Sequence, residues 1–313
     1  MTLASGAAYT ALMSHKFAAL ATSSALAFVC ATAWVDAQRS QKPSESRTRE
    51  VYASVVDGNG KAITGLTAAD FVVREEGTAR EVLKAGPATE PLTIALTVDD
   101  SQASTRYIQF IRDGLNSFFK RLDGKAQIAL STFGERPTPL VEYTDSTVAL
   151  QKGATRIFAR SGGGSYLLEA LVELSRGIER RETAVRKAIV VIFVEDGPEF
   201  SNLYSKNVLD ALKRSGATLH VLALGQPAPP SSDELRNRNI VVADGTSMTG
   251  GRRDQVLAES GLGDRLIQLA DELTNQYVIT YSRPDALIPP EKLDVSSTKP
   301  DVKVRAPKVA PGK

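Results

Sequence analysis

The chain has 313 residues, of which 42% are hydrophobic and 24% charged, which is enough apolar material for one large or two modest globular domains. Its formal net charge is +2, and basic and acidic residues are interspersed along its length. This balance argues against binding to nucleic acid or to an anionic membrane surface.

The first residues have the pattern of a secretory signal peptide. An almost uncharged run rich in Ala and Leu occupies residues 17–33, and two candidate cleavage sites end at Ala33 and Ala37. We therefore expect residues 1–37 to be removed, with Met13 as an alternative start, and the mature protein to be secreted or periplasmic without a membrane span. The alternative is an uncleaved membrane anchor, although the run is short for a span.

Cysteine and histidine are almost absent from the expected mature chain. Cys30 is the only cysteine and lies within the apolar run, so disulfides, thiolate zinc sites and cysteine nucleophiles are excluded. His15 lies in the same segment, which leaves His220. We expect His220 to be a packed core residue of a buried strand rather than a ligand. The expected mature chain therefore offers only one histidine, which argues against a histidine metal site and against Ser-His catalysis.

A small all-β module is predicted near the start of the mature chain. Residues 38–50 are polar and charged, which indicates a flexible leader. Short runs with strand composition follow, separated by turn signals, at residues 51–56, 71–74 and 81–83. A module of three short strands in fewer than forty residues is too slight to be stable alone, so we expect the module at residues 51–90 to pack against the rest of the chain.

From residue 92 the pattern changes to alternating strands and helices. The predicted strands are residues 94–98, 127–133, 140–143, 188–194, 218–224 and 277–281. The predicted helices, where apolar residues recur at helical spacing, are residues 107–122, 147–159, 166–182, 204–215 and 262–274. Residues 226–248 have no assigned structure, and residues 285–313 are predicted to form a Pro- and Lys-rich tail with at most one weak strand near residues 302–304.

This alternation indicates the α/β class, with a doubly wound, mostly parallel, Rossmann-like sheet. The run at residues 188–194 is apolar throughout, as expected for a strand covered on both faces. Ligands of such sheets bind beyond the carboxyl ends of the strands. Three polar clusters are expected at that edge, at residues 99–104, 162–165 and 195–197. Their convergence predicts a functional site.

The clusters resemble the metal-ion-dependent adhesion site of the von Willebrand factor A (VWFA) family, over a domain that would span residues 91–284. That site combines Asp-x-Ser-x-Ser after the first strand, a Thr in a later loop and an Asp after the central strand. The matching segments here are Asp99-Asp100-Ser101-Gln102-Ala103, Gly163-Gly164-Ser165 and Asp196-Gly197. The resemblance implies that Asp99, Ser101, Ser165 and Asp196 hold Mg²⁺ or another divalent cation.

The resemblance also implies a binding surface around the cation. Asp100, Gln102, Gly164 and Glu195 are expected at its rim, facing a protein or peptide partner. In the family one coordination position stays open, and an exposed Asp or Glu of the partner fills it. Magnesium suits such a site because it prefers octahedral oxygen ligands and keeps several waters.

The likeness extends beyond the site. The segment VYASVVDGNGKAITGLTAADFVVREEGTAREV at residues 51–82 is similar to the β-module of a bacterial secreted VWFA-related family that is common in acidobacteria. The stretches TGGR at residues 249–252 and NQYVITY at residues 275–281 resemble later landmarks of that family.

One position departs from the family pattern. Ala103 stands where the second Ser is expected, and a methyl group cannot coordinate a metal. Ser104 comes one residue later and could instead be the N-cap of the following helix, whereas Ser165 in place of Thr keeps the hydroxyl. Two interpretations stay open: a cation site in which water replaces the missing ligand, or a relic site in which Asp99 and Asp196 are solvated acids at strand ends.

The leading hypothesis is an extracytoplasmic, non-enzymatic module of adhesion type that engages a partner carboxylate through this partly degenerate site. The first alternative is a metal-free structural or scaffolding VWFA domain. The second is a phosphotransferase-like hydrolase with Asp-x-Asp after its first strand, but Ser101 stands where the second Asp would act as general acid. A Ser-His hydrolase would need Gly-x-Ser-x-Gly, so we expect no enzymatic activity.

Overall fold

The computed structural model describes residues 47–181, 185–227, 229–283 and 290–309. The expected signal peptide, residues 1–37, lies outside these ranges, as does most of the expected leader. No helix within the described ranges is long and apolar enough to cross a membrane.

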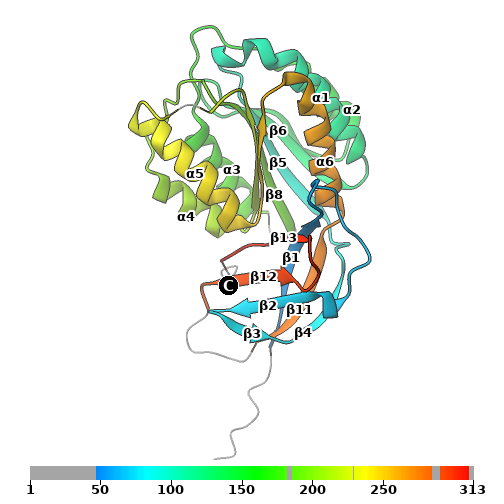
Figure 1. The fold of residues 1–313 in the computed structure, drawn as a ribbon. Coiled ribbons are helices and arrows are strands. Elements are labelled where there is room, and N and C mark those ends of the chain that lie inside the picture. The colour runs from blue at the N-terminus through cyan, green and yellow to red at the C-terminus, as the bar shows by residue number, and fades with distance from the viewer. Residues whose placement is uncertain (1–46, 182–184, 228, 284–289, 310–313) are drawn as a thin grey trace, which may run out of the picture. The chain divides into compact units, whose positions relative to one another are not determined.

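A six-stranded sheet forms the centre of the α/β domain (Figure 1). Its strands lie in the order β10 (Arg253–Val256), β9 (Thr218–Leu224), β8 (Arg186–Val194), β5 (Leu92–Val98), β6 (Ala126–Thr132) and β7 (Thr138–Thr144). All neighbours are parallel except β7, which pairs antiparallel with β6 at one edge. Strands β5 and β9 are buried along their whole length, because helices cover both faces of the sheet.

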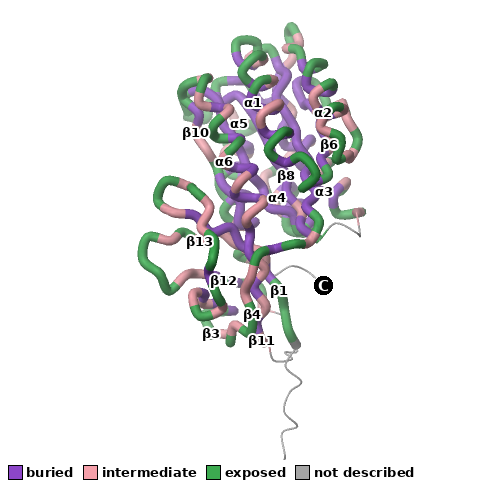
Figure 2. The backbone as a smooth tube through the Cα atoms, turned by 90° about the vertical axis from the view of Figure 1, so that its right-hand side faces the viewer, coloured by how far each residue is buried: buried purple, intermediate pink, exposed green. Residues whose placement is uncertain are grey.

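Among the described residues, three α-helices cover each face of this sheet. One face carries α1 (Ile108–Arg121), α2 (Thr147–Ala154) and α6 (Leu262–Thr274); the other carries α3 (Leu167–Glu179), α4 (Ser205–Ser215) and α5 (Asp233–Thr249). Figure 2 shows the buried strands running between helices that are partly exposed. The predicted doubly wound, mostly parallel fold is therefore confirmed, and each predicted helix begins within one residue of its expected start.

Helix α5 is the one that local sequence pattern missed, within residues 226–248. Its ends do carry signals: Ser232 Oγ accepts a hydrogen bond from Leu235 N at 3.2 Å, and Gly250 ends the helix with a φ of 75°. Its interior lacks a clear apolar face because Arg238, a charged residue, points inward and is buried. The contacts that satisfy Arg238 come from a distant strand end, so the local sequence does not reveal them.

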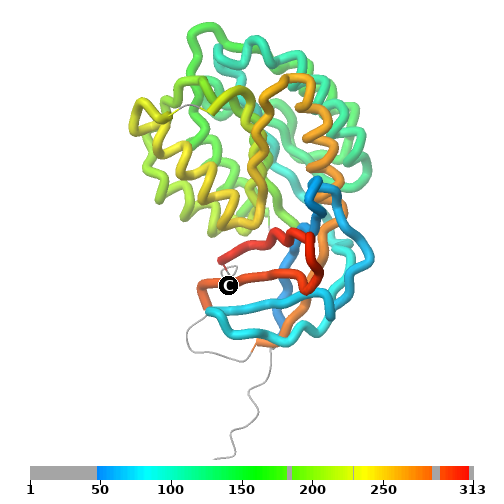
Figure 3. Tube along the Cα trace, viewed as in Figure 1, coloured from blue at the N-terminus to red at the C-terminus, as the bar shows by residue number. Residues whose placement is uncertain are grey.

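The β-module is built from both ends of the described chain. One sheet has the order β13 (Lys303–Arg305), β1 (Arg47–Val56), β11 (Tyr277–Arg283) and β4 (Val82–Pro87). A second has the order β12 (Leu293–Ser297), β2 (Phe71–Glu75) and β3 (Thr78–Arg80), and the two sheets share one apolar core. Figure 3 shows the red C-terminal strands beside the blue and cyan N-terminal strands.

This arrangement corrects three expectations. Residues 47–50 belong to β1 and not to a leader, β11 belongs to the β-module and not to the central sheet, and the expected tail supplies both β12 and β13. The reason is antiparallel pairing between residues far apart in sequence, such as Val51 with Ile279. Local periodicity shows that a segment is a strand, but it does not show which sheet the strand joins.

His220 lies in β9 and is fully buried, which confirms that it is a core residue. Its Nε2 lies 3.0 Å from Thr218 Oγ1. Burial lowers the pKa of His220 to about 4, because the charged ring would lose its hydration, and the nearby Glu272 carboxylate offsets only part of this effect.

We expect the protein to lose stability as the pH falls from about 7 to about 4. In this window the imidazole of residue 220 takes up a proton in the unfolded chain but not in the folded chain, so protonation favours unfolding. The stability that the neutral His220 gives to the folded chain is complete only above the unfolded pKa of 6.5. Since one pKa unit corresponds to about 1.4 kcal/mol, His220 alone should remove about 3 kcal/mol. Urea unfolding across this range measures the loss, and His220→Gln should abolish that part of it. Equal pH dependence in both proteins would contradict the assignment.

Candidate metal centre

The three polar segments expected at one edge of the sheet do lie together. Gln102 joins the first to the second, since its backbone N donates to Gly163 O at 3.1 Å and its Oε1 accepts from Gly162 N at 2.9 Å. Ser165 joins the second to the third through its N, which donates to Pro198 O at 3.0 Å. The loops after β5 and β8 and the loop before α3 therefore form one connected rim.

Asp99 lies at the carboxyl end of β5 and is fully buried. Its Oδ1 accepts a hydrogen bond from Ser101 N at 2.9 Å, and its Oδ2 accepts one from Val194 N at 3.2 Å. Burial raises the pKa of Asp99, although the nearby Ser101 hydroxyl and the hydrogen bonds from the Ser101 and Val194 amides partly oppose this effect. No Lys, Arg or His of the described residues forms an ion pair with it, so this buried carboxylate lacks a direct cationic partner.

Ser101 has a buried hydroxyl. Its Oγ is among the buried polar atoms that have no hydrogen-bond partner in the described part of the chain. The hydroxyl of the buried Ser104 donates to Ser101 O at 2.7 Å. Ser104 also lies inside the short 3₁₀ helix at Gln102–Tyr107, whose N-cap is Ser101, so the expectation that Ser104 is an N-cap is wrong.

Ser165 contacts an acid that sequence reasoning missed. Its Oγ donates to Glu199 Oε2 at 3.1 Å, while Glu199 Oε1 accepts from Leu167 N at 3.1 Å at the start of α3. Burial raises the pKa of Glu199 to about 7. A hydroxyl that gives its proton to Glu199 keeps its lone pairs for another donor or for a cation. Nothing local pointed to Glu199, because its partner lies 34 residues away.

Asp196 is the exposed member of the set. It follows Glu195 after β8 and lines an open cavity of about 600 Å³ together with Glu199, Phe200 and Glu234. Its Oδ1 lies 3.6 Å from the position that a Cβ would take on Gly225, at the end of β9. Asp196 therefore presents its carboxylate to solvent beside the rim.

The residues expected to face a partner are mostly buried, which corrects that assignment. Asp100 accepts from Arg160 Nε at 2.9 Å and from Gly134 N at 2.6 Å, so it locks the neighbouring loops. The ring of Phe200 covers Gly164, leaving no room for a side chain there. Gln102 is exposed, but its side chain holds the glycine loop.

Glu195 is also buried and forms ion pairs with two arginines. It lies 3.5 Å from Arg238 Nη2 and forms a second ion pair with Arg253. Arg238 further donates to Glu195 O at 3.0 Å and to Gly197 O at 3.2 Å. These arginines anchor the loop that presents Asp196. The sequence does not indicate this role, because each arginine lies in a polar segment far from Glu195 along the chain.

The donor set fits a cation site that depends on hydroxyl groups. No cluster of three or more His, Cys, Asp or Glu side chains that could hold a metal occurs in the described residues. The candidate ligands are instead two carboxylates and two hydroxyls, and the unpartnered Ser101 Oγ next to the buried Asp99 is the feature that a cation would satisfy. Ala103 leaves one position to water.

Comparison with known proteins agrees with the fold. Residues 94–198 match the model of the von Willebrand factor type A domain. No curated protein sequence matches the chain. The narrower resemblance to a bacterial secreted family stays a prediction.

Several solved structures are similar to the chain. A von Willebrand factor type A protein from Catenulispora acidiphila is 12% identical with a TM-score of 0.49, over 85% of this chain and 74% of that one. The vWF domain of the type V pili tip protein Mfa5 from Porphyromonas gingivalis is 13% identical with a TM-score of 0.44, over 58% and 95%. Proximal thread matrix protein 1 from the mussel byssus, with a zinc-occupied MIDAS motif, is 15% identical with a TM-score of 0.47, over 64% and 49%.

Proposed function

The chain contains a von Willebrand factor type A domain, and from this premise we propose that it is an extracytoplasmic, non-enzymatic protein-binding module. Its partner is a protein or peptide with an exposed Asp or Glu. The binding site is the candidate metal centre, with Asp99, Ser101, Ser165 and Asp196 as the residues that would hold Mg²⁺ or another divalent cation.

One observation supports this proposal most directly. The Asp99 carboxylate is fully buried without an ion-pair partner among the described residues, and the adjacent Ser101 Oγ is buried without a hydrogen-bond partner. A buried carboxylate that accepts hydrogen bonds but has no cationic partner, and a buried hydroxyl without a hydrogen-bond partner, each cost free energy. A divalent cation would satisfy both groups at once.

The bound cation would supply a positive site for the partner's carboxylate. The chain's own residues define what surrounds it. Neutral hydroxyls of Ser101 and Ser165 leave more of the cation's charge for an external ligand than two further carboxylates would. The ion pair of Asp100 with Arg160 and the ion pairs of Glu195 with Arg238 and Arg253 neutralise the other rim acids, so they compete less for the cation.

Calorimetric titration with Mn²⁺ and Mg²⁺ tests the metal site, and we expect saturable heat. A random peptide library selected on the immobilised protein in Mn²⁺ tests the partner chemistry. The selected peptides should contain Asp or Glu, should elute with EDTA, and should lose binding when the acid is replaced by its amide. Peptides that remain bound in EDTA would instead support a metal-free scaffold.

Restoring the missing hydroxyl should strengthen the site. A Cβ on Gly197 would lie 3.1 Å from the Ala103 Cβ, so residue 103 faces the loop that carries Asp196. In Ala103→Ser a protein hydroxyl can replace a water ligand, and we expect about tenfold tighter Mn²⁺ binding, or about 1.4 kcal/mol. Calorimetry on both proteins measures this, and unchanged affinity would place residue 103 outside the coordination sphere.

A metal-free structural role is the second candidate, and Ala103 itself favours it. Its methyl group packs against the apolar cluster between the sheet and α1. In that case EDTA would change neither the stability of the chain nor its binding to a partner.

A further inference from the structure

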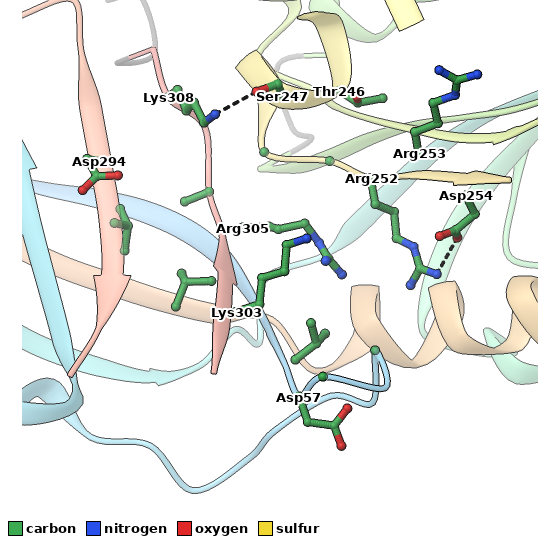
Figure 4. Close-up of a pocket in the computed structure, with 18 of the residues that line it drawn as sticks. Asp57, Thr246, Ser247, Arg252, Arg253, Asp254, Asp294, Lys303, Arg305 and Lys308 are labelled. Atoms are coloured by element: carbon green, nitrogen blue, oxygen red, sulfur yellow. Dashed lines mark hydrogen bonds and ion pairs between the residues drawn. The ribbon is translucent and has the colours of Figure 1, made fainter. Parts of the chain in front are cut away.

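A second polar cavity lies toward the amino-terminal ends of the sheet strands, whereas the candidate metal centre lies at their carboxyl ends. It has a volume of about 550 Å³ and lies where the end of α5 and the start of β10 meet strands of the β-module (Figure 4). Six residues with cationic side chains line it: Arg252, Arg253, Arg265, Lys303, Arg305 and Lys308. Of these, Arg253 forms its ion pair with Glu195 and so adds little free charge to the cavity. We propose that this cavity binds a small multivalent oxyanion, carried by a phosphate or sulfate group.

The carboxylates that line the cavity leave part of this charge uncompensated. Asp254 forms an ion pair with Arg252. Asp57 turns back onto its own loop, where Oδ1 accepts from Asn59 N at 2.8 Å and from Lys61 N at 2.9 Å. Figure 4 shows the carboxylates of Asp57 and Asp294 pointing away from the central cations. Within the described ranges, Lys303 forms no ion pair.

One buried carboxylate holds two of these cationic side chains in place. Glu272 is buried, and its carboxylate accepts from Arg252 Nη1 at 3.0 Å, from Arg305 Nε at 3.1 Å and from Arg305 Nη2 at 2.6 Å. One carboxylate thus fixes two guanidinium groups and does not use all of their N–H donors. A site whose donors are already ordered loses less conformational entropy when it binds a ligand.

The side chain of Lys303 extends toward the same part of the cavity as these two arginines. Lys303 and Arg305 are two residues apart on β13, so they lie on the same face of the strand. Figure 4 shows both side chains extending from β13 toward Arg252. Like charges that share one space repel each other, and an anion between them removes this repulsion. Guanidinium forks match the oxygen geometry of phosphate and sulfate groups, and the cavity is large enough for a small organic ester of either.

Calorimetry on the full chain at constant ionic strength tests the site, with pyrophosphate, sulfate and acetate as probes. We expect saturable binding that is tightest for pyrophosphate, weaker for sulfate and absent for acetate. Absence of saturable pyrophosphate heat, or acetate binding of equal strength, would overturn the proposal. Sulfate binding as tight as that of pyrophosphate would identify a sulfate group as the ligand chemistry.

Lys303→Gln is the decisive variant, because Lys303 holds no structural ion pair among the described residues, whereas changing Arg305 would leave Glu272 with one partner fewer. We expect it to weaken pyrophosphate binding about tenfold. Lys84→Gln removes the same charge from an exposed lysine on β4 of the same module and should have no effect. An equal loss in both variants, or a lower melting temperature of Lys303→Gln with unchanged affinity, would show that Lys303 has only a general or structural role.

Discussion

Glu272→Ala is expected to lower the free energy of unfolding by about 3–5 kcal/mol, which is the usual cost of removing one partner from a buried ion pair. Glu272 lies on α6 and forms ion pairs with Arg252, just before β10, and with Arg305 on β13. Although burial alone would raise it, the hydrogen bonds and charge of Arg305 and the charge of Arg252 keep the pKa of Glu272 below its usual value. Without this carboxylate, two largely buried guanidinium groups lose their shared partner.

Urea unfolding at neutral pH measures this loss. Glu259→Ala is the matched control, because Glu259 forms an exposed pair with Arg106 at 3.9 Å. Exposed pairs contribute about 0–1 kcal/mol, so the control should stay close to the native protein. Similar small losses in both variants would mean that Glu272 does not join the β-module to the α/β domain energetically.

Asp196→Asn is expected to weaken Mn²⁺ binding by about 100-fold or more while leaving stability unchanged. Loss of an outer partner of a metal ligand already costs about 10- to 100-fold in affinity, and Asp196 would be a charged ligand. Its side chain is exposed, and such surface changes usually stay within about 0.5 kcal/mol. The variant therefore separates binding from folding, which the buried Asp99 does not allow.

Calorimetry and urea unfolding on the same preparation measure the two effects. Glu173→Gln, which removes a carboxylate from the exposed face of α3, serves as the control and should leave both quantities unchanged. Unaltered Mn²⁺ affinity in Asp196→Asn would contradict its role as a ligand, and a large loss of stability would indicate a structural role instead.

Glu195 and Asp196 are adjacent acids, yet they face opposite environments. Both residues lie in the turn that follows β8, where Glu195 is buried against Arg238 and Arg253 while Asp196 is exposed at the rim. Both residues have the same chemistry in the sequence. Their difference in function follows from which side of the strand end each one occupies.

Local sequence pattern is sufficient to specify the α/β domain and the place of the candidate site. Continuous apolar runs at β5, β8 and β9 predict buried parallel strands, and helical periodicity predicts α1, α3, α4 and α6 close to their observed bounds. Parallel strands end at a common edge, so the order of the strands and polar segments along the chain is enough to place Asp99, Ser165 and Asp196 on one rim. The spacing of apolar and polar residues carries this information directly.

Long-range contacts, in contrast, control which polar residues stay available to a ligand. Asp100, Glu195 and Gly164 have the sequence pattern of rim residues, but Arg160, Arg238 and Phe200 cover or neutralise them from distant segments. Pairing between distant segments likewise places β11, β12 and β13 in the β-module. The free energy of such a contact depends on burial and geometry that arise only when the chain has folded, so local pattern does not record it.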